Sequence, residues 1–384
     1  MSRTPKRLLI YSADFWPTTG GVQSVVMTLA RGFGAGSQCW RGPVVTETPA
    51  GATSDSDLTF RVVRKPSLIE LVRLLRQSDL VHIAGPALRP LAIGLLLRKQ
   101  VVVEHHGFQT LCPNGLLFHE PTHAPCPGHF FAGRHRECWK CNARAGYWKS
   151  LRLWALTFLR RWSCRLVAAN IAPTRWLDRL LRLPRTFIIA HGVTERSSLP
   201  LPRERTPTFA FVGRLVSTKG VELLLRASRE LLNKGLEFRL SIVGEGPERK
   251  SLERLCSELG LAPKVDLLGE IPEQDVDKLL GDAIAVVIPS VAGEVFGLVA
   301  VENMMRGRSV IVPEGGALAE VAGETGLKFA AGDPISLAAC MEQFLRSPKL
   351  ATELGERARN HGLKLFRDKR MLEDHWALYQ KVLE

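Results

Sequence analysis

Short runs of apolar residues alternate with amphipathic stretches along the whole chain. Each run has the length and composition of a strand, and apolar positions between the runs recur at helical spacing. Short apolar strands separated by amphipathic helices predict parallel sheets that are covered by helices on both faces. The predicted strands are residues 8–11, 80–83, 101–104 and 170–172 in the first half, and residues 209–212, 239–243, 265–268, 283–288 and 309–312 in the second.

The length of 384 residues predicts two domains, because one hydrophobic core rarely grows to this size. A proline-rich stretch at 197–208 is the expected linker between α/β domains at 1–196 and 209–366. Residues 367–384 form an expected helix with one apolar face, which needs a groove and should pack back toward the N-terminal domain. We therefore predict two facing Rossmann-like, doubly wound domains with ligands in the cleft between them.

The net charge of +14 is distributed unevenly along the chain. The first 200 residues hold 27 Lys and Arg against 11 Asp and Glu, or +16, and the remainder carries −2. Such a basic half suits nucleic acid, anionic lipid or a phosphorylated substrate. The chain has no nucleic-acid-binding motif, so we expect no nucleic acid partner. It also lacks a secretory apolar core and any apolar run of about 18 residues, which predicts a cytoplasmic protein.

The strongest chemical signal follows the predicted strand at 283–288. Glu294 lies in the loop after this strand, and Glu302 lies inside the next helix. The amino end of that helix can bind a phosphate, and a carboxylate with two acceptor oxygens suits a vicinal diol. The alternative is that both glutamates are solvated surface residues. The helix opens with Phe296, Gly297 and Leu298.

Two other predicted strands of the second half also end in glycine loops. Arg214 and Lys219 follow the strand at 209–212 and could bind a diphosphate. The alternative is that this is a basic loop that binds no ligand. Glycines let a nucleotide approach the backbone closely. The remaining loop residues are Gly213 in the first loop and Gly244, Glu245 and Gly246 in the second.

The first half carries a glycine loop and a pair of histidines at the ends of its strands. Gly20 and Gly21 precede a helix, where small residues let a phosphate or an acceptor approach backbone N–H groups. His105 and His106 follow the strand at 101–104. Either histidine could border a ligand or be a satisfied core residue.

The order of these pieces resembles the retaining GT-B glycosyltransferases of family GT4. The matching motifs are Gly-Arg-Leu…Lys-Gly, then Val-Gly-Glu-Gly-Pro, then Pro-Ser…Glu-Val-Phe-Gly-Leu…Glu-Asn. The resemblance implies that 1–196 binds the acceptor and 209–366 binds a nucleotide-sugar donor. It implies transfer with retention of the anomeric configuration by front-face attack, with no cofactor and no metal at the donor phosphate.

The resemblance also assigns roles to individual residues. Arg214 and Lys219 match the diphosphate-binding pair, and Glu302 matches the glutamate that binds the ribose. Glu294 matches the glutamate beside the donor sugar. His106, rather than His105, matches the histidine that borders the same sugar.

The implied reaction moves a hexose from a UDP- or GDP-sugar to a glycan or lipid-linked acceptor in polysaccharide or glycolipid biosynthesis. Two alternatives stay open: a nucleotide-sugar epimerase on the same fold, and a non-catalytic basic binding protein. The sequence specifies neither the base, the sugar, the acceptor nor the oligomeric state.

The basic first half also suggests peripheral binding at the inner face of an anionic membrane. The stretch 144–166 is predicted to be a helix with an apolar stripe and basic residues opposite. The alternative is that this stripe packs on its own sheet and that scattered arginines do the docking. The stripe consists of Leu151, Ala155, Phe158, Trp162 and Leu166.

The segment 112–141 holds four of the eight cysteines and four of the ten histidines. It is rich in Pro and Gly and offers little apolar surface, so we expect something other than a core to order it. A Cys-x-x-Cys pair favours a structural zinc site, with reduced thiols or redox chemistry as alternatives. The predicted ligands are Cys112, Cys126, Cys138 and Cys141.

Overall fold

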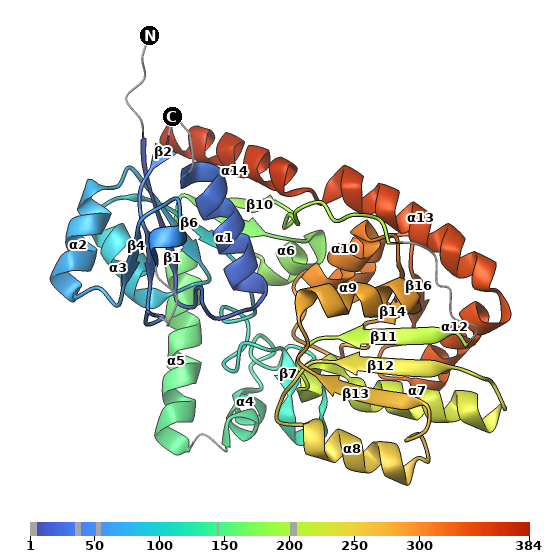
Figure 1. Ribbon diagram of the computed structural model, residues 1–384. Coiled ribbons are helices and arrows are strands. Elements are labelled where there is room, and N and C mark those ends of the chain that lie inside the picture. The colour runs from blue at the N-terminus through green and yellow to red at the C-terminus, as the bar shows by residue number, and fades with distance from the viewer. Residues whose placement is uncertain (1–5, 35–39, 51–54, 144–145, 200–205) are drawn as a thin grey trace. The chain divides into compact units, whose positions relative to one another are not determined.

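The computed structural model describes residues 6–34, 40–50, 55–143, 146–199 and 206–384. Within these residues the chain forms two α/β units, each built on a parallel sheet (Figure 1). This architecture confirms the prediction of two Rossmann-like domains. Unit 1 comprises Met1–Leu117, Pro127–Gly192 and Asp368–Glu384, and unit 2 comprises Phe118–Cys126 and Val193–Arg367.

The sheet of unit 1 has the strand order β10-β9-β6-β5-β1-β3-β4, with β2 paired to β1. Its central strands are rich in apolar residues because helices cover both faces; every residue of β5, including His82, is buried. The strands are β1 (Lys6–Ser12), β2 (Trp40–Arg41), β3 (Val44–Thr46), β4 (Val62–Arg64), β5 (Leu80–Ala84), β6 (Gln100–Glu104), β9 (Ala169–Ala172) and β10 (Thr186–Ile188).

Seven helices of unit 1 lie in the described residues: α1 (Gly21–Gly34), α2 (Leu68–Gln77), α3 (Leu88–Leu96), α4 (His135–Cys141), α5 (Tyr147–Cys164), α6 (Arg175–Leu181) and α14 (Asp368–Leu383). The helix expected at 367–384 is α14, and it packs on α1. Its Trp376 stacks on Phe33 with 6.5 Å between ring centroids. Gly32 has no side chain and so leaves room for Leu372, whose Cδ2 would lie 2.4 Å from a Cβ at that position.

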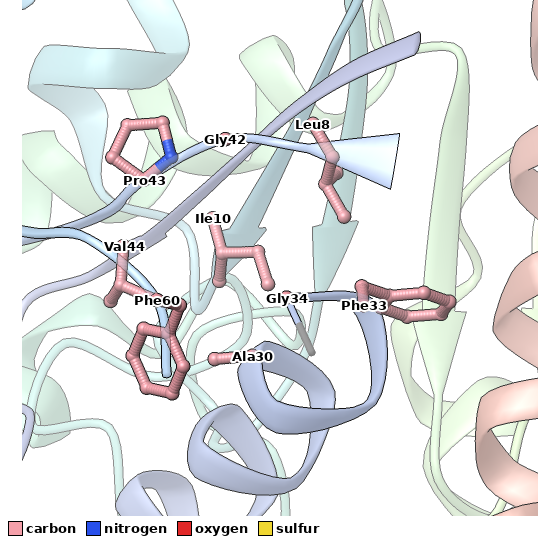
Figure 2. Close-up of a pocket in the computed structure, with 9 residues that line it drawn as sticks. All are labelled: Leu8, Ile10, Ala30, Phe33, Gly34, Gly42, Pro43, Val44 and Phe60. Carbon is pink, nitrogen blue, oxygen red and sulfur yellow. The ribbon is translucent and has the colours of Figure 1, made fainter. Parts of the chain in front are cut away.

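A small pocket lies between β1, α1 and the start of β3 (Figure 2). Side chains of Leu8, Ile10, Phe33, Val44 and Phe60 line it. All of these are apolar, so the pocket offers no group that could orient a polar ligand. It is a gap in the core of unit 1.

The sheet of unit 2 has the strand order β13-β12-β11-β14-β15-β16, and β7 and β8 form a separate hairpin. Helices α7 and α8 lie on one face of the sheet, and α9 and α10 lie on the other (Figure 1). The strands are β7 (Phe118–His119), β8 (Ala124–Pro125), β11 (Thr208–Val212), β12 (Arg239–Val243), β13 (Val265–Gly269), β14 (Ala283–Val287), β15 (Ser309–Pro313) and β16 (Leu327–Phe329). The helices are α7 (Val221–Asn233), α8 (Arg249–Glu258), α9 (Glu273–Asp282), α10 (Leu298–Met305), α11 (Gly316–Ala322), α12 (Pro334–Arg346) and α13 (Pro348–Leu365).

The segment 112–141 differs from the expectation in two ways. Residues 118–126 group with unit 2, whereas the sequence interpretation assigned the whole segment to the N-terminal domain. The segment also contributes to a core, since Phe118 and Phe130 are buried. Phe130 packs against Phe158 of α5 with 4.5 Å between ring centroids. Apolar packing therefore orders much of a segment that we had expected to lack apolar surface.

None of the helices in the described residues combines the length and the apolarity needed to cross a bilayer.

Candidate functional site

The loops with candidate chemistry in unit 2 follow β12, β11 and β14, three neighbouring strands of one parallel sheet. Parallel strands end at the same edge, so the structure brings these loops together. The helices that follow β11 and β14 lie on opposite faces of the sheet (Figure 1). The sheet therefore has its topological switch point between these two strands, the place where such folds bind ligands.

The glycines of the first two loops allow backbone segments to touch. A Cβ on Gly244 would lie 1.9 Å from the carbonyl oxygen of Gly213, and a Cβ on Gly246 would lie 2.2 Å from that of Leu215. The N–H of Leu215 donates to the carbonyl of Glu245 at 2.8 Å. Any side chain larger than hydrogen at Gly244 or Gly246 would push the two loops apart.

Lys219 and Glu294 form an ion pair across the switch point. Lys219 ends the short 3-10 turn Ser217–Lys219 after β11, and Glu294 lies in the loop after β14. Two backbone contacts hold these loops together. The carbonyl of Thr218 accepts the N–H of Val291 at 2.9 Å, and Gly220 lies so close to Pro289 that a Cβ would be 2.1 Å from its carbonyl oxygen.

Ser290 supports this pair and was missed by the sequence analysis as a site residue. Its hydroxyl donates to Glu294 Oε1 at 3.1 Å. Both charged side chains are only partly exposed, 26% for Lys219 and 19% for Glu294. Glu294 thus has two partners, Lys219 and Ser290, and both charged side chains can be reached from solvent.

The helix α10 begins where the sequence predicts. Gly297 precedes it at φ 105°, a left-handed conformation that favours glycine, and its first turn holds no acidic residue. The N–H groups of Ala300 and Val301 donate to the carbonyl of Gly297 at 3.0 and 3.3 Å, which leaves those of Leu298 and Val299 at the positive dipole end of the helix. Phe296 is buried and packs edge-on against Phe366. Its side chain stabilises the core here, and its role in donor binding stays a prediction.

Glu302 lies one turn into α10, where burial raises the pKa of its carboxyl. Arg306 opposes this shift only in part, because its guanidinium lies 4.0 Å from Glu302 and is also paired to Asp277 at 2.8 Å. Glu302 is therefore a partly desolvated carboxylate. Its oxygens can accept more hydrogen bonds than its charged neighbours donate.

The other predicted polar residues of unit 2, Arg214 and Glu245, are exposed to solvent. Arg214 is exposed directly after Gly213. Glu245 is paired with Arg249 on α8, so its carboxylate is already engaged. The structure thus leaves Arg214 accessible to a ligand and ties Glu245 to the helix.

In unit 1, the glycine loop and the histidine pair lie at the same sheet edge, after β1 and β6. Gly20 is exposed and Gly21 begins α1, whose first turn holds no acidic residue. His106 is almost buried, and its Nε2 lies 3.3 Å from Glu104 Oε2. His105 is fully buried with Nε2 3.0 Å from Asn170 Oδ1, and burial lowers its pKa to about 4. His105 is therefore a core histidine.

The cysteines of the predicted zinc site occupy different surroundings. Cys112 and Cys138 are buried, and Cys126 and Cys141 are partly exposed. Cys126 belongs to unit 2 and the other three belong to unit 1. Among the described residues, the structure gathers two groups with metal-ligand geometry, and both consist of Glu104 and histidines. Zinc at the cysteines stays a prediction.

The predicted helix with an apolar stripe is α5, and the alternative that the stripe packs on its own sheet is wrong for its second half. Phe158, Trp162 and Leu166 are exposed, with Trp162 at 61%. The buried face of α5 instead carries small residues, among them Ser150 and Thr157.

Comparisons with known proteins find similarity to glycosyltransferases in part of the chain. Residues 195–361 match the model described as Glycosyl transferases group 1. An uncharacterized glycosyltransferase of Methanocaldococcus jannaschii is 44% identical over 111 residues, 29% of this chain and 28% of that protein. A D-inositol 3-phosphate glycosyltransferase of Corynebacterium jeikeium is 34% identical over 182 residues, 44% and 43% of the two chains. The chain thus spans less than half the length of these relatives.

Solved structures resemble the whole chain. A sucrose-phosphate synthase from Thermosynechococcus elongatus has a TM-score of 0.76 at 20% identity, covering 98% of this chain and 99% of its own. The Anabaena protein HepE in complex with UDP and glucose has a TM-score of 0.73 at 17% identity, covering 98% and 100%. Residues 195–361 thus match the glycosyl transferases group 1 family, and the chain as a whole has the two-unit GT-B fold of these similar structures.

Proposed function

We propose that this protein is a retaining hexosyltransferase of family GT4 that needs no metal at the donor phosphate. It moves a hexose from a UDP- or GDP-sugar to a glycan or lipid-linked acceptor in polysaccharide or glycolipid biosynthesis. The observation that carries the proposal is the Lys219–Glu294 ion pair at the switch point of unit 2, inside the segment that matches the family model.

In this proposal the loops of unit 2 bind the donor. Arg214 and Lys219 contact the diphosphate together with the amino end of α10, because two cations and a helix dipole stabilise a dianionic group. Glu302 accepts hydrogen bonds from the ribose hydroxyls. The glycine backbone at 244–246 contacts the base.

The transfer step breaks the bond between the anomeric carbon and the diphosphate oxygen. The acceptor oxygen forms its new bond on the same face of the sugar, and its proton passes to the departing diphosphate. Lys219 and Arg214 stabilise the charge that develops on this leaving group. Glu294 and His106 position the sugar.

We further propose that unit 1 binds an anionic membrane from the cytoplasmic side. The exposed aromatic side chains of α5 and the net charge of +16 in the first 200 residues support this, because interfacial helices combine both features. Trp148 at 79% and Trp162 at 61% exposure are the largest apolar groups on this helix that face solvent. Membrane binding would bring the enzyme to a lipid-linked acceptor.

A donor-turnover assay tests the enzymatic proposal. UDP- and GDP-hexoses are incubated with the protein in the presence of a chelator, and the products are resolved by chromatography. A transferase without acceptor releases free sugar and nucleoside diphosphate slowly. An epimerase instead gives an isomerised nucleotide sugar, and a non-catalytic protein leaves the donor intact; either result would contradict the proposal.

Structural zinc at Cys112, Cys126, Cys138 and Cys141 is a separate proposal, supported by the Cys-x-x-Cys spacing at the end of α4. Protein purified without chelator should hold zinc with sulfur neighbours, and this sulfur-bound zinc should be lost when Cys138 and Cys141 are replaced by serine. Thiolate-free zinc coordination in the wild type would contradict it.

A further inference from the structure

Glu104 is the centre of a buried cluster in unit 1 that the proposed transfer reaction does not explain. Four histidines direct Nε2 at its carboxylate. His82 and His106 lie 3.2 and 3.3 Å from Oε2, and His191 and His375 lie 3.4 and 3.6 Å from Oε1. The side chains of Glu104, His82 and His375 have no solvent exposure.

The hydrogen bonding of His375 defines which of its nitrogens carries a proton. Nδ1 lies 2.8 Å from the backbone carbonyl oxygen of Met371, which can only accept a hydrogen bond, so Nδ1 must donate. A neutral His375 then presents the lone pair of Nε2 to Glu104 Oε1. Two electron pairs facing each other in a solvent-free site repel, and either a proton or a metal ion between them relieves this repulsion.

His82 has the same arrangement on the other oxygen of Glu104. Its Nδ1 lies 2.9 Å from the hydroxyl of Tyr379, so its outer nitrogen has a fixed partner while Nε2 faces the carboxylate. Histidines that bind metals almost always bond their second nitrogen to a carbonyl, carboxylate or other polar group, which orients the ring. Both histidines show this feature.

We propose that His82, Glu104 and His375 bind a divalent cation of the zinc class. Their ligand atoms all lie within 4.8 Å of one another. One carboxylate oxygen of Glu104 and two imidazole nitrogens provide three protein ligands, the number found in zinc sites whose fourth position is open. Around a tetrahedral ion with bonds of about 2.0–2.1 Å, neighbouring ligands lie about 3.3–3.4 Å apart. The observed nitrogen to oxygen distances of 3.2 and 3.6 Å bracket this value.

Glu104 also groups with His106 and His191. We assign the ion to His82 and His375 because both rings are fully buried and Nδ1 of each ring has a hydrogen-bonding partner. His106 is already assigned to the donor sugar.

The position of the three ligands indicates what the ion does. His82 lies on β5, Glu104 ends β6 and His375 lies on α14. The ion therefore joins the C-terminal helix to two central strands of unit 1. It also holds the carboxylate that faces His106, so it has a positioning role for that histidine.

The test uses the full chain with Cys138 and Cys141 replaced by serine, so that the paired thiolates do not contribute. Zinc alone is added, excess is removed by gel filtration, and zinc content is measured together with X-ray absorption at the zinc edge. We expect about one zinc per chain with nitrogen and oxygen neighbours at about 2.0–2.1 Å and no sulfur at about 2.3 Å. The X-ray absorption spectrum of the zinc-loaded wild type is measured as well. It shows whether imidazole is bound to zinc even if the serine variant does not fold.

Two tyrosine variants test the ligand assignment. Tyr379→Phe removes only the hydroxyl beside His82, and we expect zinc affinity to fall about 10- to 100-fold. Tyr147→Phe, at an exposed tyrosine, should leave the affinity unchanged. Absence of histidine-bound zinc in the wild type would overturn the proposal. Zinc binding that is insensitive to Tyr379→Phe would overturn the assignment to His82.

Discussion

Replacement of Lys219 by methionine should separate the two roles of its ion pair with Glu294. In the free protein this pair joins the loops after β11 and β14. In the donor complex, Lys219 is expected to contact the leaving diphosphate. The variant should therefore lose a little stability and much turnover.

The size of each effect follows from the surroundings. The pair is partly exposed, so it lies between a surface ion pair, worth less than about 1 kcal/mol, and a buried one, whose breakage costs about 3–5 kcal/mol. Ser290 still bonds Glu294 at 3.1 Å, and we expect a loss of about 1–2 kcal/mol. This lowers Tm by about 2–4 °C for each kcal/mol in a unit of this size. Removing one group that stabilises the developing charge lowers kcat by about 10²- to 10³-fold.

Donor hydrolysis measures kcat, and thermal unfolding measures stability. A matched control is Lys234→Met, because Lys234 forms a similar pair with Glu342 at 2.7 Å, outside the three candidate loops of unit 2. This control should lower Tm slightly and leave turnover unchanged. If Lys219→Met kept wild-type turnover, or if the control lost as much activity, the assignment of Lys219 to the leaving group would be wrong.

Three other changes have defined outcomes. Glu302→Gln should raise Tm more at pH 8 than at pH 5. Burial raises the pKa of the Glu302 carboxyl in the folded protein, so this carboxyl contributes stability below its unfolded pKa and loses that contribution as the pH rises through its folded pKa. An equal change in Tm at both pH values would refute this. Gly244→Ala should destabilise unit 2 by at least about 2 kcal/mol in denaturant unfolding, because its Cβ would overlap the Gly213 carbonyl and φ is 134°. Trp162→Ser should weaken salt-sensitive sedimentation with anionic vesicles, whereas Ile335→Ser, at an exposed apolar site of unit 2, should not.

The sequence predicts the fold well because the strands that build the two cores are continuous apolar runs. All nine predicted strands form within one or two residues of their expected ends. The prediction misses β2, β3, β4, β7, β8, β10 and β16, each of which has only two or three residues. Two or three residues contain too little pattern to separate a short strand from a loop.

The site is predicted less completely. The positions of Lys219, Glu294 and Glu302 can be predicted because each follows the end of a recognisable strand. The structure places these strands, β11 and β14, next to each other in the sheet. The cluster around Glu104 was not predicted from the sequence, because its members come from β5, β6, α14 and the segment after β10, which lie far apart in the chain. One signal was present: His375 interrupts the apolar face of the last helix, where a polar residue needs a buried partner.

The most direct test of the donor site is calorimetric titration of the protein with UDP and GDP in the presence of a chelator. We expect one of the two nucleotides to bind at one site per chain. Glu302→Ala should weaken that binding about 10- to 100-fold, because hydrogen bonds to a charged group are worth about 1.5–3 kcal/mol. Absence of binding by both nucleotides, or undiminished binding by the variant, would contradict the account.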